Sequence, residues 1–176
     1  ISPDILLTGK ALGGGLPLGA FISSYKMMHC LTHHPVLGHI TTFGGNPVSA
    51  TTALAVLDVI EEEKLIKNAK EIGDYLMEGF KDLKKRHPGF VADVRGRGLM
   101  LGIELAAKDK TPLPQQTARV IELCRENGVI IGKGGLFANV IRIKPALNIT
   151  KENANTLLDV MGKAIATVEK ESQILV

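Results

Sequence analysis

The sequence predicts a mixed α/β chain in two parts, and three observations predict it. A short apolar strand at 4–8 leads into a glycine-rich loop, and helical periodicity dominates 47–86. After Gly89 the pattern changes to strands, glycine turns and helices, which is typical of a small α+β unit. We therefore expect residues 1–88 to form the end of a large α/β domain and residues 89–176 to form a small α+β domain.

The elements of the first part follow from its apolar pattern and its caps. Residues 20–24 predict a second strand. Asn46-Pro47 predicts a helix start, with Asn as the N-cap and Pro in the first turn. The helix at 47–63 is apolar almost all round, so we expect it to be buried. A second helix at 64–86 carries an apolar stripe and precedes a Pro-Gly stop.

The second part alternates strands and helices. We expect a strand, a turn and a strand over 91–105, with the turn at Arg95-Gly96-Arg97-Gly98. A helix begins at Pro114 and ends before Gly128, and Thr150 caps a last helix. Two further strands are predicted at 129–131 and 140–143.

Composition excludes several classes of protein. The 21 Lys and Arg against 18 Asp and Glu leave a scattered charge of +3, so we expect no nucleic-acid partner. No apolar run approaches the ~18 residues of a membrane span, so we expect no membrane partner. Cys30 and Cys124 make no disulfide framework, which favours a reducing compartment. We expect a cytoplasmic location, with the mitochondrion as the alternative, because a targeting signal would lie upstream of Ile1.

Several familiar signatures are incomplete. Gly9-Lys10 is followed by Ala11, so the phosphate-binding P-loop pattern fails, and no Gly-x-Gly-x-x-Gly fingerprint is complete. No Gly-x-Ser-x-Gly elbow is present. The loop at 29–41 holds His29, Cys30, His33, His34 and His39, which are metal-ligand types in irregular spacing. An ordinary polar loop is the commoner explanation, and we expect no metal site.

Lys10 is the most informative single residue. It follows an apolar strand and precedes Gly13-Gly14-Gly15, against which a planar group could lie. A lysine in a desolvated site can act as a free amine for Schiff-base chemistry. A solvated lysine in a turn is the simpler alternative.

Two further positions are candidates for anion binding. Thr42 precedes Gly44-Gly45 and a helix start, where backbone N–H groups favour a phosphate, although Asn46 alone would explain a plain cap. Arg142 lies inside an apolar strand, where it is either an edge residue in water or a clamp for a carboxylate. We interpret Arg95 and Arg97 as structural or interface residues.

The two halves together resemble a known family. The segment from Ser2 to Ala20 closely resembles the cofactor-lysine segment of class III aminotransferases, and His39 to Pro47 resembles their second motif. Residues 95–105 resemble the start of their small C-terminal domain. Residues 132–135 and 141–145 resemble the branch of the mitochondrial-type alanine–glyoxylate aminotransferases.

The resemblance implies a fold, a cofactor and residue roles. The fold is that of fold-type I pyridoxal-phosphate-dependent transferases, with residues 1–88 supplying the C-terminal part of the cofactor-binding domain and the interdomain helices. Lys10 would carry pyridoxal 5'-phosphate as the internal aldimine and shuttle a proton. Thr42 would bind the cofactor phosphate of the neighbouring subunit in a homodimer. Arg142 would bind the substrate carboxylate.

The implied reaction is transamination between an amino acid and a 2-oxo acid or glyoxylate. Pro145-Ala146 departs from the Pro-Pro of the branch, and the family's upstream half is missing. The chain alone is therefore expected to be inactive. An ω-amino acid or acetylornithine aminotransferase, or a lyase or aminomutase of the same group, is the close alternative. A non-catalytic truncated fragment is the alternative from a different class.

Overall fold

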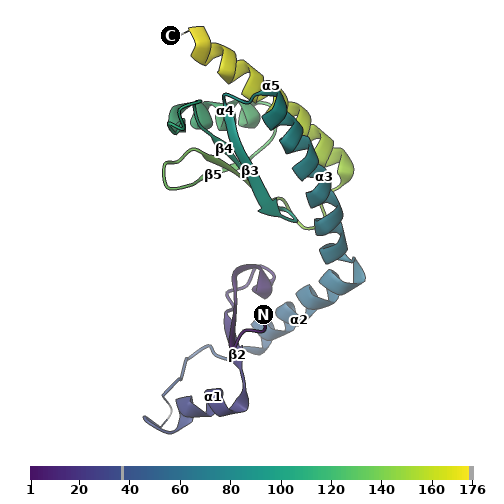
Figure 1. Cartoon of the computed structure of the whole chain (residues 1–176). Coiled ribbons are helices and arrows are strands. Elements are labelled where there is room, and N and C mark those ends of the chain that lie inside the picture. Colours follow the sequence, from purple (N-terminus) through teal and green to yellow (C-terminus); the bar gives the residue numbers. More distant parts are fainter. Residues whose placement is uncertain (37, 175–176) are drawn as a thin grey trace. The chain divides into compact units, whose positions relative to one another are not determined.

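The chain forms two compact units (Figure 1). The computed structural model describes residues 1–36 and 38–174. Unit 1 is Ile1–Lys64 and unit 2 is Leu65–Val176.

Unit 1 contains two short strands and three short helical elements before one long helix. Strands β1 and β2 pair antiparallel, with Thr8 opposite Ala20. The glycine-rich loop between them begins with a 3-10 turn. In chain order the elements are β1 (Ile5–Thr8), η1 (Lys10–Gly13), β2 (Ala20–Ser23), α1 (Tyr25–His29), η2 (Cys30–Thr32) and α2 (Pro47–Glu62).

Helix α2 begins where the sequence predicts. The Asn46 side chain accepts hydrogen bonds from the backbone N–H groups of Val48 (3.1 Å) and Ser49 (3.2 Å), so the cap is formed. The expected burial of α2 is wrong for this chain, because its only buried residue is Ala53. Leu54 remains 62 % exposed. Within unit 1 the helix packs against η1, which covers only a small part of its apolar surface.

Unit 2 contains a four-stranded antiparallel sheet and three helices. The strand order is β3-β4-β6-β5, so the two edge strands are β3 and β5. The elements are α3 (Leu65–Arg86), β3 (Val91–Arg97), β4 (Met100–Leu105), α4 (Pro114–Glu126), β5 (Gly132–Gly134), β6 (Val140–Ile143) and α5 (Lys151–Ile174).

One face of this sheet forms the core with the helices. Alternation along β4 and β6 places Leu101, Ile103 and Leu105 on the same face as Ile141 and Ile143. All five are buried, and α3 and α5 lie side by side over them (Figure 1). The helical side of the core includes Leu76, Phe80, Leu83, Val120, Cys124, Met161 and Ile165.

Within unit 2, helix α3 makes a close contact with the backbone of the turn between β3 and β4. A Cβ at Gly73 would lie 2.3 Å from the backbone carbonyl of Gly98, so only glycine allows this approach. Gly98 has a φ of 54° and starts the turn between β3 and β4. The boundary between the two compact units therefore lies before α3, earlier in the chain than the domain boundary expected after residue 88. The large and small domains of the complete enzyme stay a prediction.

Two local predictions in unit 2 are wrong. The hairpin turn lies at Gly98-Leu99, because Arg95, Gly96 and Arg97 of β3 all pair with residues of β4. The strand expected at 129–131 forms instead at Gly132–Gly134, where it pairs with β6.

Candidate active site

Lys10 lies at the end of β1 in an unusual backbone conformation. Its φ is 55°, in the left-handed region that residues with a Cβ seldom adopt. The turn around it is fixed by backbone hydrogen bonds from Leu12 N–H to Gly9 O (3.2 Å) and from Gly14 N–H to Ala11 O (3.0 Å). Lys10 is exposed, and among the described residues no carboxylate lies within 4.0 Å of its ammonium. Such strain is concentrated at functional sites, which favours a functional role over a plain turn lysine.

The glycines after Lys10 have two different surroundings. Gly14 has a φ of 60°, and a Cβ there would lie 3.0 Å from Val56 of α2, so this glycine lets the loop approach the helix. A Cβ at Gly15 would meet no atom within 4 Å. The loop is therefore packed on one side and open at Gly15, which leaves room for a planar group beside the backbone.

Thr42 lies in the turn that precedes α2. It is exposed, and the turn is closed by a hydrogen bond from Asn46 N–H to Phe43 O (3.2 Å). Asn46 already caps the first N–H groups of α2, so a phosphate at this turn would depend on Thr42 and on the turn's own N–H groups. No hydrogen bond links Thr42 to Lys10 within residues 1–36 and 38–64.

Arg142 lies at the centre of the open face of the unit 2 sheet. Its neighbours along β6, Ile141 and Ile143, are 0 % and 2 % exposed on the other face, whereas Arg142 is exposed. The alternation predicted from the sequence is therefore confirmed. Directly opposite Arg142 are Gly102 on β4 and Gly132 on β5.

These two glycines leave the arginine unobstructed. A Cβ at Gly132 would lie 3.5 Å from the Nε and Nη2 atoms of Arg142, so the guanidinium lies over the backbone of β5. A larger side chain would compete for that place. Gly102 and Gly132 fall in the motifs at 95–105 and 132–135, but their place beside Arg142 was not predicted, although a glycine inside a strand is a signal of close approach.

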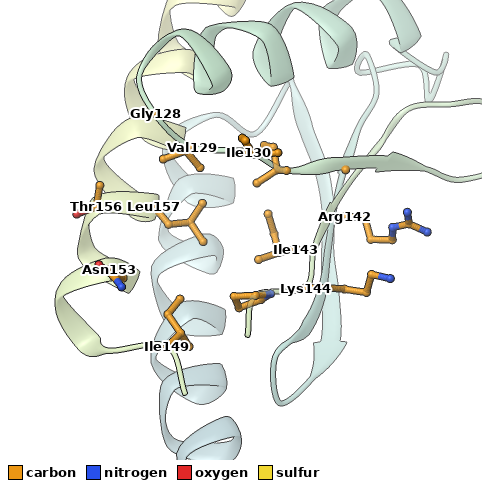
Figure 2. Close-up of a pocket in the computed structure, with 13 residues that line it drawn as sticks. Gly128, Val129, Ile130, Arg142, Ile143, Lys144, Ile149, Asn153, Thr156 and Leu157 are labelled. Atoms are coloured by element: carbon orange, nitrogen blue, oxygen red, sulfur yellow. The ribbon is translucent and has the colours of Figure 1, made fainter. Parts of the chain in front are cut away.

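Two hollows meet at Arg142, on opposite faces of the sheet. A cavity of ≈ 490 Å³ between β6, α5 and the segment at 128–132 is mainly apolar, and Asn153 and Thr156 are its polar helix residues. In Figure 2 Ile143 points toward α5, whereas Arg142 and Lys144 point the other way. That other side is a hollow of ≈ 210 Å³, also lined by Arg95 and Gly102. The guanidinium of Arg142 is on the side of this smaller hollow.

The two arginines that line the smaller hollow, Arg95 and Arg142, differ in their carboxylate partners. Arg95 Nη1 lies 2.8 Å from an Asp93 oxygen and 2.7 Å from a Glu104 oxygen. The hydrogen bond from Arg95 lowers the pKa of the Asp93 carboxyl below its ordinary value. Within the described residues, no carboxylate lies within 4.0 Å of Arg142. Arg95 is thus paired with two carboxylates, which favours the structural one of its two predicted roles, whereas Arg142 has no such partner among the described residues.

The described part of the chain offers neither a metal-binding cluster nor a membrane span. Residues 1–36 and 38–174 hold no group of three or more His, Cys, Asp or Glu that could bind a metal ion. No helix there has both the length and the apolarity to cross a membrane.

The structure assigns the three predicted site residues to two units. Lys10 and Thr42 belong to unit 1, and Arg142 belongs to unit 2. Each stands on the element the sequence indicated: the end of a strand, the turn before a helix, and an apolar strand.

Curated relatives match almost the whole chain. It is 47 % identical over 168 residues to the alanine–glyoxylate aminotransferase 2 homolog 2, mitochondrial, of Arabidopsis thaliana, covering 94 % of this chain and 34 % of that protein. It is 39 % identical over 172 residues to a leucine/methionine racemase of Thermococcus litoralis, covering 97 % and 38 %. The chain therefore spans little more than a third of the length of these relatives.

Solved structures share the fold. A phospholyase from Arthrobacter in complex with phosphoethanolamine matches with a TM-score of 0.89 and 33 % identity, covering 94 % of this chain and 39 % of that one. An amine transaminase of an uncultivated Pseudomonas species, in the PLP-bound internal aldimine form, matches with a TM-score of 0.85 and 30 % identity, covering 96 % and 39 %. The predicted pyridoxal-phosphate-dependent transferase fold is confirmed.

The family model described as Aminotransferase class-III matches residues 1–165, nearly the full chain. The relatives and the fold agree with that match. The chain belongs to the class III aminotransferases.

Proposed function

We propose that this chain is part of a pyridoxal-phosphate-dependent aminotransferase that transfers an amino group between an amino acid and a 2-oxo acid or glyoxylate. The observation that carries the proposal is Lys10, a lysine with a left-handed backbone at a strand end, followed by a glycine loop open at Gly15. The 47 % identity to an alanine–glyoxylate aminotransferase homolog favours these substrates.

The residues present fit the cofactor. Lys10 offers an unpaired primary amine, and Thr42 offers an exposed hydroxyl for a phosphate. Bound pyridoxal phosphate withdraws electrons from the Cα of the amino acid. Lys10 would hold the cofactor through a Schiff base and move the proton at the substrate Cα. Thr42 would bind the phosphate of the cofactor in the partner subunit of a homodimer.

Arg142 would orient the substrate. Its planar guanidinium can bind the α-carboxylate through two parallel hydrogen bonds, which lysine cannot reproduce. The glycines on both sides of it keep the sheet surface free for the carboxylate.

The activity is tested on the complete enzyme with matched lysine variants. With L-alanine and glyoxylate, Lys10→Ala should abolish transamination. Lys64→Ala is the control, because Lys64 is also exposed and also has a left-handed φ, of 52°. Equal activity of the two variants would contradict the proposal.

The same assay separates the alternatives. The 39 % identity to a leucine/methionine racemase favours racemisation as a second candidate, since it also needs proton transfer at Cα. Conversion of L-alanine to D-alanine without an oxo acid would support it. Faster turnover of 4-aminobutyrate or acetylornithine would support an ω-amino acid or acetylornithine aminotransferase, and phosphate release from phosphoethanolamine would support a lyase.

The role of Arg142 is tested by Arg142→Lys in the complete enzyme. Loss of a charge-assisted hydrogen bond should lower kcat/KM by about ten- to hundredfold, mainly through KM. Arg97→Lys, at an exposed position on the same sheet, is the control. Unchanged kinetics of Arg142→Lys would show an edge arginine in water. The absorption of the bound cofactor serves as the folding check.

Localisation is a separate prediction. We keep the cytoplasm as the expected compartment, and the mitochondrial names of the relatives make the mitochondrion the alternative to test.

A further inference from the structure

Two histidine rings meet at the junction of α1 and η2. The Nε2 atoms of His29 and His33 are 2.5 Å apart, and the rings stand edge to face with centroids 4.1 Å apart. Both side chains are exposed in this chain, so an ion in solution can reach them here. The aminotransferase function gives this pair no role.

The Thr32 hydroxyl contacts His29 at two points. The Thr32 hydroxyl donates its one hydrogen to the backbone carbonyl of His29 (2.8 Å). Its oxygen also lies 3.2 Å from His29 Nδ1, and having no further hydrogen it must accept there. This arrangement favours the His29 tautomer with its proton on Nδ1, in which Nε2 presents a lone pair toward His33.

Histidines that bind metal ions have the same hydrogen-bond arrangement. A metal-binding histidine donates its other ring N–H to an oxygen acceptor, which orients the ring. Tyr25 adds a second support, because its ring stacks on His29 at a centroid distance of 5.2 Å and an interplanar angle of 18°. The His29 ring is thus held on one face by Tyr25 and at Nδ1 by Thr32.

We propose that His29 and His33 form a two-histidine site for a divalent transition-metal ion of the class that imidazole prefers, such as Ni²⁺, Cu²⁺ or Zn²⁺. Both Nε2 atoms would bind the ion, and water would complete its coordination, since the described residues supply no third ligand. Metal–nitrogen bonds of about 2.0–2.1 Å require the two nitrogens to separate to roughly 3 Å. Exposed rings on adjacent turns can make this small rotation.

The test uses Ni²⁺ as the probe and the complete protein, by isothermal titration calorimetry. His29→Ala and His33→Ala should each weaken Ni²⁺ binding by about tenfold or more, because losing a ligand costs at least as much as losing its outer partner. His34→Ala is the matched control, as it removes an adjacent exposed histidine. If His29→Ala and His33→Ala bind Ni²⁺ as the control does, the site does not exist.

Thr32 is tested as a positioning residue. Thr32→Val removes the acceptor for His29 Nδ1 and should weaken Ni²⁺ binding by about tenfold, whereas Thr32→Ser keeps the hydroxyl and should restore it. Equal binding by the Val and Ser variants would overturn the role of Thr32.

A second measurement needs no variant and so does not depend on variant folding. Ni²⁺ should protect His29 and His33, but not His34, from acylation by diethyl pyrocarbonate, as mapped by peptide mass spectrometry. Equal acylation of all three with and without Ni²⁺ would overturn the proposal.

Discussion

Unit 1 and unit 2 differ sharply in how much apolar surface they bury. Among the described residues, the buried hydrophobic side chains lie in unit 2 with the single exception of Ala53. In unit 1, Leu7 on β1 is 76 % exposed and Val48 on α2 is 63 % exposed. Exposed apolar surface on this scale marks an interaction surface, and we expect further polypeptide to cover it.

The difference bears separately on the predicted site residues of each unit. Arg142 stands on a sheet whose other face forms a complete core, so its place depends on unit 2 alone. Lys10 stands at the end of a two-stranded sheet with little buried surface. We therefore expect the carboxylate site to be preformed in this chain and the cofactor site to need the rest of the enzyme.

The largest expected effect is on autonomous folding. Residues 65–176 expressed alone should unfold cooperatively, because the core of unit 2 is self-contained. Residues 1–64 expressed alone should lack a cooperative transition, because two short strands and one helix bury too little apolar surface. Thermal melts followed by circular dichroism measure both. A cooperative melt of residues 1–64 would remove the contrast between the units.

Two leucine variants compare how well apolar side chains are packed in unit 1 and in unit 2. In the 176-residue chain, Leu83→Ala on α3 should lower the free energy of unfolding by about 2–5 kcal/mol, because Leu83 is 1 % exposed. Leu54→Ala on α2 should change it by less than about 0.5 kcal/mol, because Leu54 is 62 % exposed. Urea unfolding of both variants checks this. Equal losses would show that α2 is packed within the chain.

In the complete protein, the effect of Leu54→Ala on the free energy of unfolding should be different. If further polypeptide covers α2, Leu54→Ala should then cost more than about 1 kcal/mol. No increase over the 176-residue chain would contradict that covering.

The smallest expected effect concerns the two cysteines. Burial raises the pKa of the Cys124 thiol to about 11, so at pH 8 it is almost wholly protonated and shielded. Cys30 in unit 1 is exposed. One thiol per chain, at Cys30, should react quickly with Ellman's reagent in the native state. Both should react in denaturant. Fast native labelling of Cys124, identified by peptide mass, would mean that the core of unit 2 opens readily.

Local features of this fold could be predicted from the sequence because they depend on neighbouring residues. The Asn46 cap, the end of β1 before Lys10 and the alternation around Arg142 all depend on residues within a few positions. The structure agrees with the sequence at each of these points.

Features that depend on distant partners could not be predicted in the same way. An apolar helix at 47–63 indicates burial, but what buries it is set by other segments. Apolar residues at 129–131 predict a strand, yet pairing with β6 selects Gly132–Gly134. The glycines beside Arg142 are likewise set by strand register, which a single sequence does not specify.

The proposed role of Lys10 as the cofactor lysine is tested most directly by trapping its adduct. The complete enzyme is incubated with pyridoxal phosphate, reduced with borohydride to trap the lysine adduct, and digested for peptide mapping. We expect a phosphopyridoxyl label on Lys10. A label on Lys64, Lys133 or Lys144 instead would contradict it.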